Sequence, residues 1–311
     1  MEKYFIYFVK LIYKFYFKNY LKKISYLLES NLKKNFTLLD IGAADGVNEK
    51  WNIISNKSNI ILVEPHKQSA QRLKNKGLNV IESVLNSEDN KEVKFYSTKK
   101  ATCSSFYKPN FNHLIKFSNS DRFKIISEEV FVSKSLDTEI KKFSQPDFIK
   151  IDTEGSELDI LKGSNDTLLN VHGLEVECSF NQLREGQPLF DEVREYLEKK
   201  DFIFIDFVTM IRWEKESFSF HGQPQITDAL FLKNEEIIIK KFLSNEINLD
   251  DLINYMVVLI IYERVDILKY VYNKTKISVK FIEEIIIILE IKQKKLNKLK
   301  QANFFIENQN L

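Results

Sequence analysis

Apolar and polar residues alternate along the middle of this chain in the way expected of an α/β protein. Short apolar runs predict strands near residues 37–41, 60–64, 79–84, 147–152, 173–179, 202–208 and 228–233. Between them, amphipathic stretches such as 68–75 and 190–199 predict helices. Because strands and helices alternate, the pattern predicts a doubly wound, mostly parallel sheet of seven strands.

Residues 92–130 fit this alternation less well. The segment 93–96 predicts an added strand, and the segment 101–129, rich in Ser and Asn, predicts a long loop. Loops of this length within a compact domain are usually functional, so we expect a lid or a substrate-binding wall here. Simple mobility is the alternative explanation.

Three carboxylates follow the predicted strand 147–152. Asp152, Glu154 and Glu157 crowd around Gly155, which lets the chain turn into the next helix. Ligands of open α/β sheets sit at the carboxyl ends of strands, and crowded carboxylates raise one another's pKa, as a general base or a metal site requires. The alternative is a helix N-terminus with acids in its first turn, which explains Glu154 and Glu157 better than Asp152.

A second candidate site follows the predicted strand 37–41. Asp40 and two glycines, Gly42 and Gly46, form an acid-x-Gly-x-x-x-Gly loop, which differs from the dinucleotide fingerprint G-x-G-x-x-G. This loop is typical of class I methyltransferases, where it holds the amino-acid end of S-adenosylmethionine. Glu64 ends the next apolar run, and a carboxylate at that position can accept hydrogen bonds from both hydroxyls of a ribose.

The motifs together resemble the FkbM family of S-adenosylmethionine-dependent methyltransferases. The matching segments are 39–43, 63–65, 135–137, 149–157, 161–163, 175–177, 190–193 and 228–232, within residues 37–233. The resemblance implies a class I, Rossmann-like fold. It also implies that the cofactor is bound by Asp40, Gly42, Ala43, Asp45, Gly46, Glu64, Pro65, Val84 and Asp152. Asp45 departs from the family, which commonly has Asn there, and its extra negative charge is unexplained.

The sulfonium methyl group of this cofactor is already electrophilic, so the protein must align an acceptor oxygen and remove its proton. We expect Asp152 to be the base or to position it, with Glu154 as the second candidate. Glu177 would orient the acceptor, and His221 would close the site. A version in which the acids hold a hydrated divalent ion stays open, although no metal ligand is assigned. The resemblance suggests a sugar hydroxyl in a cell-surface glycan or a related metabolite as the acceptor.

The composition is that of a cytoplasmic globular protein. The chain has 311 residues, of which 44% are hydrophobic and 29% charged, and its net charge is +2. Cys103 and Cys178 are its two cysteines, so no disulfide framework is expected. The four histidines lack the spacing of a zinc site, and no nucleic-acid partner is predicted.

The first 34 residues concentrate positive charge, with eight lysines and two glutamates. Lys10, Lys14, Lys18 and Lys22 recur every fourth position and would form one stripe on a helix whose other positions are largely aromatic. This pattern is typical of a helix that lies in a membrane interface, so residues 1–23 are expected to attach the chain to an anionic, cytoplasmic membrane face. A helix packed on the domain, or in a homodimer interface, is the alternative.

Residues beyond 234 form a helical extension rich in Ile, Leu, Lys and Asn, without glycine or proline. A docking or dimerisation surface is its default interpretation. The expected organisation is therefore an amphipathic helix at 1–30, a methyltransferase domain at 31–234 and a helical extension at 235–311.

Two other functions are weighed against a methyltransferase. One is a catalytically silent, membrane-associated scaffold on the same fold, which the intact Asp40, Gly42, Gly46, Glu64 and Asp152 disfavour. The other is a nucleotide-sugar oxidoreductase, which the missing third glycine disfavours. Titration with S-adenosylmethionine and with NAD distinguishes the three functions.

Overall fold

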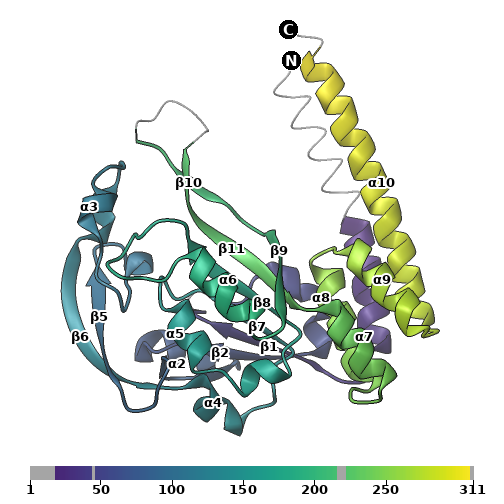
Figure 1. Cartoon of the computed structure of the whole chain (residues 1–311), viewed down its shortest axis with the longest axis horizontal. Helices are drawn as coiled ribbons and strands as arrows, with labels where there is room; N and C mark the ends of the chain where they lie inside the picture. Colours follow the sequence, from purple (N-terminus) through teal and green to yellow (C-terminus); the bar gives the residue numbers. More distant parts are fainter. Residues whose placement is uncertain (1–17, 44–45, 216–221, 309–311) are drawn as a thin grey trace. The chain divides into compact units, whose positions relative to one another are not determined.

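The computed structural model describes residues 18–43, 46–215 and 222–308 (Figure 1). The chain divides into two compact units. Unit 1 comprises Met1–Asn35, Asn48–Ser58 and Ile238–Leu311, and unit 2 comprises Phe36–Val47 and Asn59–Ile237.

The centre of unit 2 is a sheet that has eight strands within the part of the chain described. In sheet order its strands are β10 (Ile211–Trp213), β11 (Gln223–Lys233), β8 (Gly173–Ser179), β7 (Phe148–Ile151), β1 (Phe36–Ile41), β2 (Ser58–Val63) and β3 (Asn79–Ile81), and β9 (Phe202–Phe207) also pairs with β11. β7 is parallel to β1 and β8, and β2 is parallel to β3, whereas β11 is antiparallel to its three neighbours. The predicted α/β fold with a mostly parallel sheet is confirmed, with β10 as an additional strand.

Three helices pack against one face of this sheet, and two of them follow its strands β7 and β8 (Figure 1). These helices are α4 (Leu136–Glu139), α5 (Glu157–Lys162) and α6 (Phe190–Glu198). Alternate strand residues such as Ile149, Ile151 and Val176 join Leu161 and Leu197 in a single buried cluster. Because burial of apolar side chains drives this packing, the strand ends that carry the polar loops are held in fixed positions. Helix α2 (Lys67–Asn75) follows β2.

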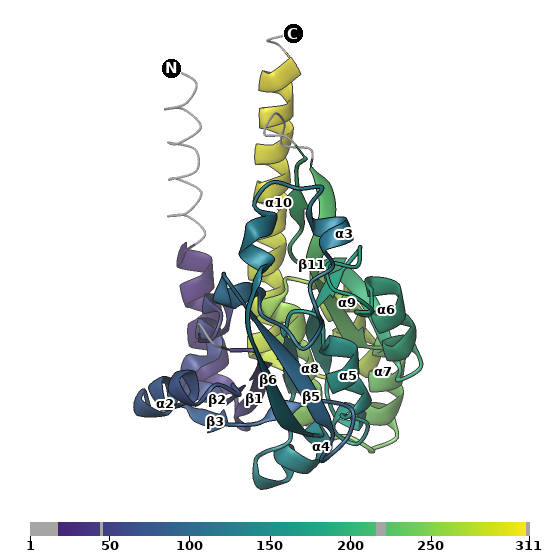
Figure 2. The same ribbon diagram turned by 90° about the vertical axis from the view of Figure 1, so that its left-hand side faces the viewer.

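A second, three-stranded sheet has the order β4-β6-β5 and lies in front in Figure 2. Its strands are β4 (Val84–Leu85), β5 (Glu92–Thr98) and β6 (Ile125–Lys134), with the short helix α3 (Phe111–Leu114) between the last two. The predicted strand at 93–96 is confirmed as part of β5. The single strand predicted at 79–84 is wrong, because β3 pairs with β2 whereas β4 pairs with β6.

The long loop predicted at 101–129 is also wrong at its end, where β6 begins. Most of the side chains of β6 are exposed, including Ile126, Val130 and Val132, so burial gives its sequence no clear alternation. Its strand conformation comes from the antiparallel pairing with β5, between Thr98↔Ile125 and Glu92↔Val132. This pairing is a long-range interaction that the local pattern does not encode.

Unit 1 is helical in its described residues. Besides residues 18–31, its helical segments are η1 (Glu49–Lys57), α8 (Leu249–Ile261), α9 (Val265–Thr275) and α10 (Lys280–Asn308), and α7 (Glu235–Leu243) crosses its boundary. Ile24, Leu28 and Leu32 are buried at helical spacing, so residues 18–32 have a packing face within the fold. No helix in the described ranges has both the length and the apolar character needed to cross a membrane.

Candidate active site

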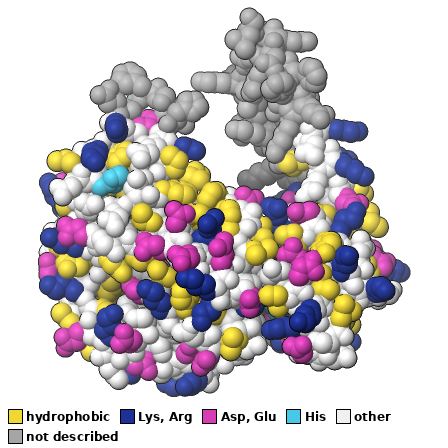
Figure 3. Space-filling view, viewed as in Figure 1, with side chains coloured by type: hydrophobic (Ala, Val, Ile, Leu, Met, Phe, Trp, Pro, Cys, Tyr) yellow, Lys and Arg dark blue, Asp and Glu magenta, His cyan; other side chains and the backbone are white. Residues whose placement is uncertain are grey.

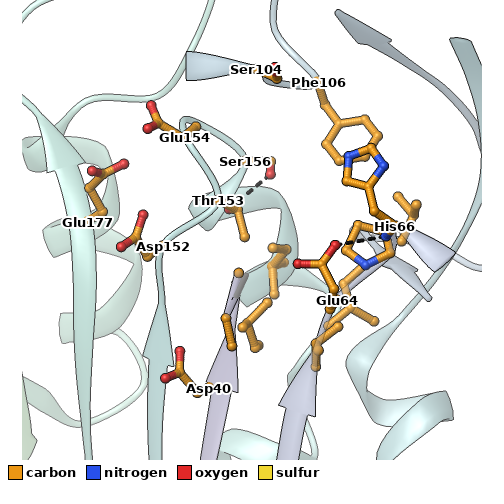
Figure 4. Close-up of a pocket in the computed structure, with 18 of the residues that line it drawn as sticks. Asp40, Glu64, His66, Ser104, Phe106, Asp152, Thr153, Glu154, Ser156 and Glu177 are labelled. Carbon is orange, nitrogen blue, oxygen red and sulfur yellow. Dashed lines mark hydrogen bonds between the residues drawn. The ribbon is translucent and has the colours of Figure 1, made fainter. Parts of the chain in front are cut away.

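A cavity of about 360 Å³ lies at the carboxyl ends of the strands of unit 2 (Figure 4). Its walls come from the ends of β1, β2, β7 and β8, from the segments that follow β1, β2, β3 and β7, and from residues 95–106. The lining residues include Asp40, Gly42, Ala43, Gly46, Glu64, Pro65, Val84, Asp152, Glu154 and Glu177. These are all the predicted site residues that the structure describes, and they come from five separate segments. Asp45 and His221 lie outside the described residues.

Gly42 brings the loop after β1 against the end of β7. Its φ is +90°, and a Cβ placed there would lie 1.8 Å from the carbonyl oxygen of Asp152. The Gly42 N–H donates to the carbonyl of Val63 over 3.1 Å, and the Asp152 N–H donates to the carbonyl of Ile41 over 2.9 Å. Any side chain at position 42 would therefore separate the segments that form the floor of the cavity.

Glu64 lies directly after β2, across the cavity from Asp152, Glu154 and Glu177 (Figure 4). Only 3% of its surface is exposed. Its carboxylate accepts a hydrogen bond from the His66 N–H over 2.8 Å. Burial raises the pKa of Glu64, although this hydrogen bond opposes the rise. The second carboxylate oxygen remains available to a ligand in addition to this backbone contact.

Aromatic rings form the wall next to Glu64. The His66 ring is 5.2 Å from that of Phe95, and the Phe95 ring is 5.0 Å from that of Phe106. Phe131 of β6 packs edge-on against Phe95 and Phe106. The region predicted as a lid or wall therefore borders the cavity, which Thr102, Ser104 and Phe106 line.

The acidic residues of the loop after β7 have different partners. Glu157 accepts hydrogen bonds from the N–H groups of Thr153 and Gly155, over 2.9 and 3.0 Å, so it closes the turn as the helix-terminus interpretation predicts. Glu154 does not act as a helix cap. It adopts a φ of +60° and forms an ion pair with Arg184, which is 1% exposed. A non-glycine residue in this conformation is strained by about 1 to 2 kcal/mol, and the ion pair helps to hold it there.

The carboxyl groups around the end of β8 resist ionisation. Burial, followed by the charges of Glu154 and Asp152, raises the pKa of Glu177 well above its usual range. Burial also raises the pKa of Glu154, against the charge of Arg184. Within the described ranges, no three His, Cys, Asp or Glu side chains are arranged to hold a metal ion.

Other residues belong to this site although the sequence interpretation left them out. Lys150 and His66 line the cavity, and Arg184 lies behind Glu154. Lys150 was detectable, because residues two apart on a strand point to the same side and Asp152 follows it by two. Arg184, between β8 and α6, has no local signal, since its partner Glu154 is 30 residues away.

The methyltransferase FkbM domain family matches residues 40–204, and the chain belongs to this family. The predicted family and the enzyme class, a methyltransferase, are confirmed. Among curated proteins, no match to the chain was found.

Several solved methyltransferase structures are distantly similar. A precorrin-6y C5,15-methyltransferase from Geobacter metallireducens GS-15 has 12% identity and a TM-score of 0.36, covering 70% of this chain and 86% of its own. The magnesium protoporphyrin IX methyltransferase of Synechocystis PCC 6803, solved with bound SAM, has 8% identity and a TM-score of 0.33, covering 70% and 79%. A Burkholderia thailandensis 1,6-didemethyltoxoflavin-N1-methyltransferase has 11% identity and a TM-score of 0.31, covering 69% and 78%.

The two glycines of the first loop provide a test of this geometry. Gly42→Ala should destabilise the protein by about 3 kcal/mol or more, because it adds a backbone clash to the strain of a positive φ. Gly46→Ala is the matched control, since Gly46 has a φ of +91° but no atom within 4 Å of an added Cβ, and it should cost roughly 1 to 3 kcal/mol. Urea unfolding of both variants measures the difference. Equal destabilisation would contradict the close approach of Gly42 to Asp152.

Proposed function

We propose that the cavity binds S-adenosylmethionine and that the chain transfers its methyl group to a hydroxyl of a sugar, in a cell-surface glycan or a related metabolite. The observation that carries the proposal is the joining of the Gly42 loop, Glu64 and Asp152 around one cavity in a chain of the FkbM family. When bound, S-adenosylmethionine supplies an electrophilic methyl group.

The residues on the Gly42 and Glu64 side of the cavity fit this cofactor. The positive φ of Gly42 and Gly46 exposes backbone where the amino-acid end would lie, and Glu64 offers a carboxylate to the ribose hydroxyls. Val84 and Leu85 add apolar surface suited to a base. This set of donors, acceptors and apolar contacts is what a nucleoside with a zwitterionic tail requires.

The acidic residues at the ends of β7 and β8 fit a hydroxyl acceptor. Asp152 accepts the proton of the attacking hydroxyl or positions the group that does so, and Glu154 is the second candidate for that role. Glu177, whose raised pKa lets it keep its proton to higher pH, can donate a hydrogen bond to the acceptor as well as receive one. Ser104 and Phe106 support a sugar, since hydroxyls pair with polar groups while aromatic rings pack on the C–H faces.

We also propose that residues 1–23 attach the enzyme to the cytoplasmic face of an anionic membrane. The lysine stripe in the sequence is the support for this proposal, since residues 1–17 lie outside the described part of the chain. Lys18 and Lys22 are exposed. Figure 3 shows acidic and basic side chains interspersed over the face in view, whereas the first 34 residues of the sequence hold eight lysines and two glutamates.

Cofactor binding is tested first with Glu64→Ala, measured by isothermal titration with S-adenosylmethionine. We expect a loss of roughly 1.5 to 3 kcal/mol for each hydrogen bond removed from the charged carboxylate. Glu82→Ala is the control, because Glu82 is an exposed residue whose carboxylate pairs with Lys74 outside the cavity. Equal affinities of Glu64→Ala and the unmodified protein would show that the ribose lies elsewhere. Binding of neither S-adenosylmethionine nor NAD by the unmodified protein would favour the scaffold.

Methyl transfer is tested with Asp152→Asn, which keeps the shape of the side chain and removes its charge. Turnover should fall about 100-fold or more, as expected for loss of a general base, while cofactor affinity changes much less. The exposed Asp166→Asn is the matched control and should retain activity. Turnover is measured as S-adenosylhomocysteine formed with a panel of sugar acceptors, with and without magnesium or a chelator. Full activity of Asp152→Asn would exclude both the base and the metal-assisted version.

Membrane attachment is tested by co-sedimentation with anionic vesicles. Each lysine near the surface contributes about 1 kcal/mol at low salt, so Lys10→Glu combined with Lys14→Glu should release much of the bound protein. The exposed pair Lys116→Glu and Lys162→Glu changes the net charge equally and should have little effect. Added salt should weaken attachment without abolishing it, because contacts of the aromatic side chains are not screened. If the two double variants partition alike, the helix has no such role.

A further inference from the structure

Lys150 of β7 lies in a row of paired residues that crosses the central sheet and is mostly acidic. It pairs with Asp40 of β1 on one side and with Glu175 of β8 on the other. The same row continues through Leu230 and Asp206, so Lys150 is its one cationic residue. Paired residues of neighbouring strands present their side chains on the same face of the sheet.

The ammonium group of Lys150 contacts two of the predicted site residues. Its Nζ lies 2.9 Å from Oδ2 of Asp152 and 4.0 Å from Oδ1 of Asp40, and 15% of its side chain is exposed. Burial disfavours the charge of Lys150, but the carboxylates of Asp152 and Asp40 outweigh this and raise its pKa above the usual value. Lys150 therefore stays protonated where it lines the cavity.

The charge of Lys150 also reaches the next acids. Burial raises the pKa of Asp228 on β11, and the charges of Glu175 and Asp152 add to that rise while Lys150 opposes it. Without the ammonium group, Asp40, Asp152, Glu175 and Asp228 would act on one another in a partly buried environment. One lysine therefore offsets charge on both the cofactor side and the acceptor side of the cavity.

We propose that Lys150 is a positioning residue, which holds the Asp152 carboxylate in place and offsets part of the acidic charge that the cavity presents to the sulfonium of the methyl donor. The proposal rests on the proposed function, since it concerns the same cofactor. In this role Lys150 limits how much more tightly the cavity binds the positively charged S-adenosylmethionine than S-adenosylhomocysteine, the product that lacks the sulfonium charge. It also fixes the direction of the carboxylate that faces the acceptor.

The test compares the affinities of S-adenosylmethionine and S-adenosylhomocysteine, which differ in the sulfonium charge. Isothermal titration of the full chain gives both, with no need for the acceptor. In Lys150→Met, the ratio of the two affinities should shift about fivefold toward S-adenosylmethionine, because one positive charge near the sulfonium is lost. Lys150→Arg keeps the charge and should preserve the ratio. Lys162→Met removes an exposed lysine of unit 2 and serves as the control.

Asp152→Asn provides a second measurement if Lys150→Met does not fold. It removes a negative charge from the same pair, so the affinity ratio should shift in the opposite direction, toward S-adenosylhomocysteine. A purely structural lesion would weaken both ligands together. An unchanged ratio in Lys150→Met, or in Asp152→Asn when the first variant is unfolded, would overturn the proposal. Failure of the unmodified protein to bind either ligand would instead overturn the proposed function.

Discussion

The close approach of Gly42 to the carbonyl of Asp152 is the constraint on which the rest of the site depends. Gly42 also donates its N–H to Val63, so one residue without a side chain connects the ends of β1, β2 and β7. A larger residue would open this junction and move Glu64 relative to Asp152. The cavity therefore owes its shape to backbone contacts, and its side chains act from positions that those contacts set.

Charge around this junction is arranged in pairs. Lys150 lies beside Asp152 and Asp40, and Arg184 lies behind Glu154, so each cation serves a different part of the carboxylate cluster. The pKa of Glu177 is instead set mainly by burial, which keeps it high. Since burial disfavours the charged form of a carboxyl, Glu177 tends to keep its proton and can donate a hydrogen bond as well as accept one.

The aromatic wall has a different origin, because it depends on pairing between strands that are distant in sequence. Phe95 of β5 and Phe131 of β6 come together through the antiparallel register of the smaller sheet, and Phe106 joins them from the segment between. The hydroxyl of Ser105 donates to the carbonyl of Glu154 over 2.7 Å, which fixes this wall to the loop after β7. One chain segment thus borders both the Glu64 side and the acidic side of the cavity.

The sequence by itself determined the alternation of strands and helices, the glycine loop after β1, and the acids at the ends of β2 and β7. These features are local, because the period of burial and the turn residues are written within a few positions of one another. Only the tertiary structure decided that β6 is a strand, that residues 79–85 divide between two sheets, and that Arg184 pairs with Glu154. Each of these depends on partners far away in the chain, and an exposed strand or a buried ion pair leaves no periodic signal in the sequence around it.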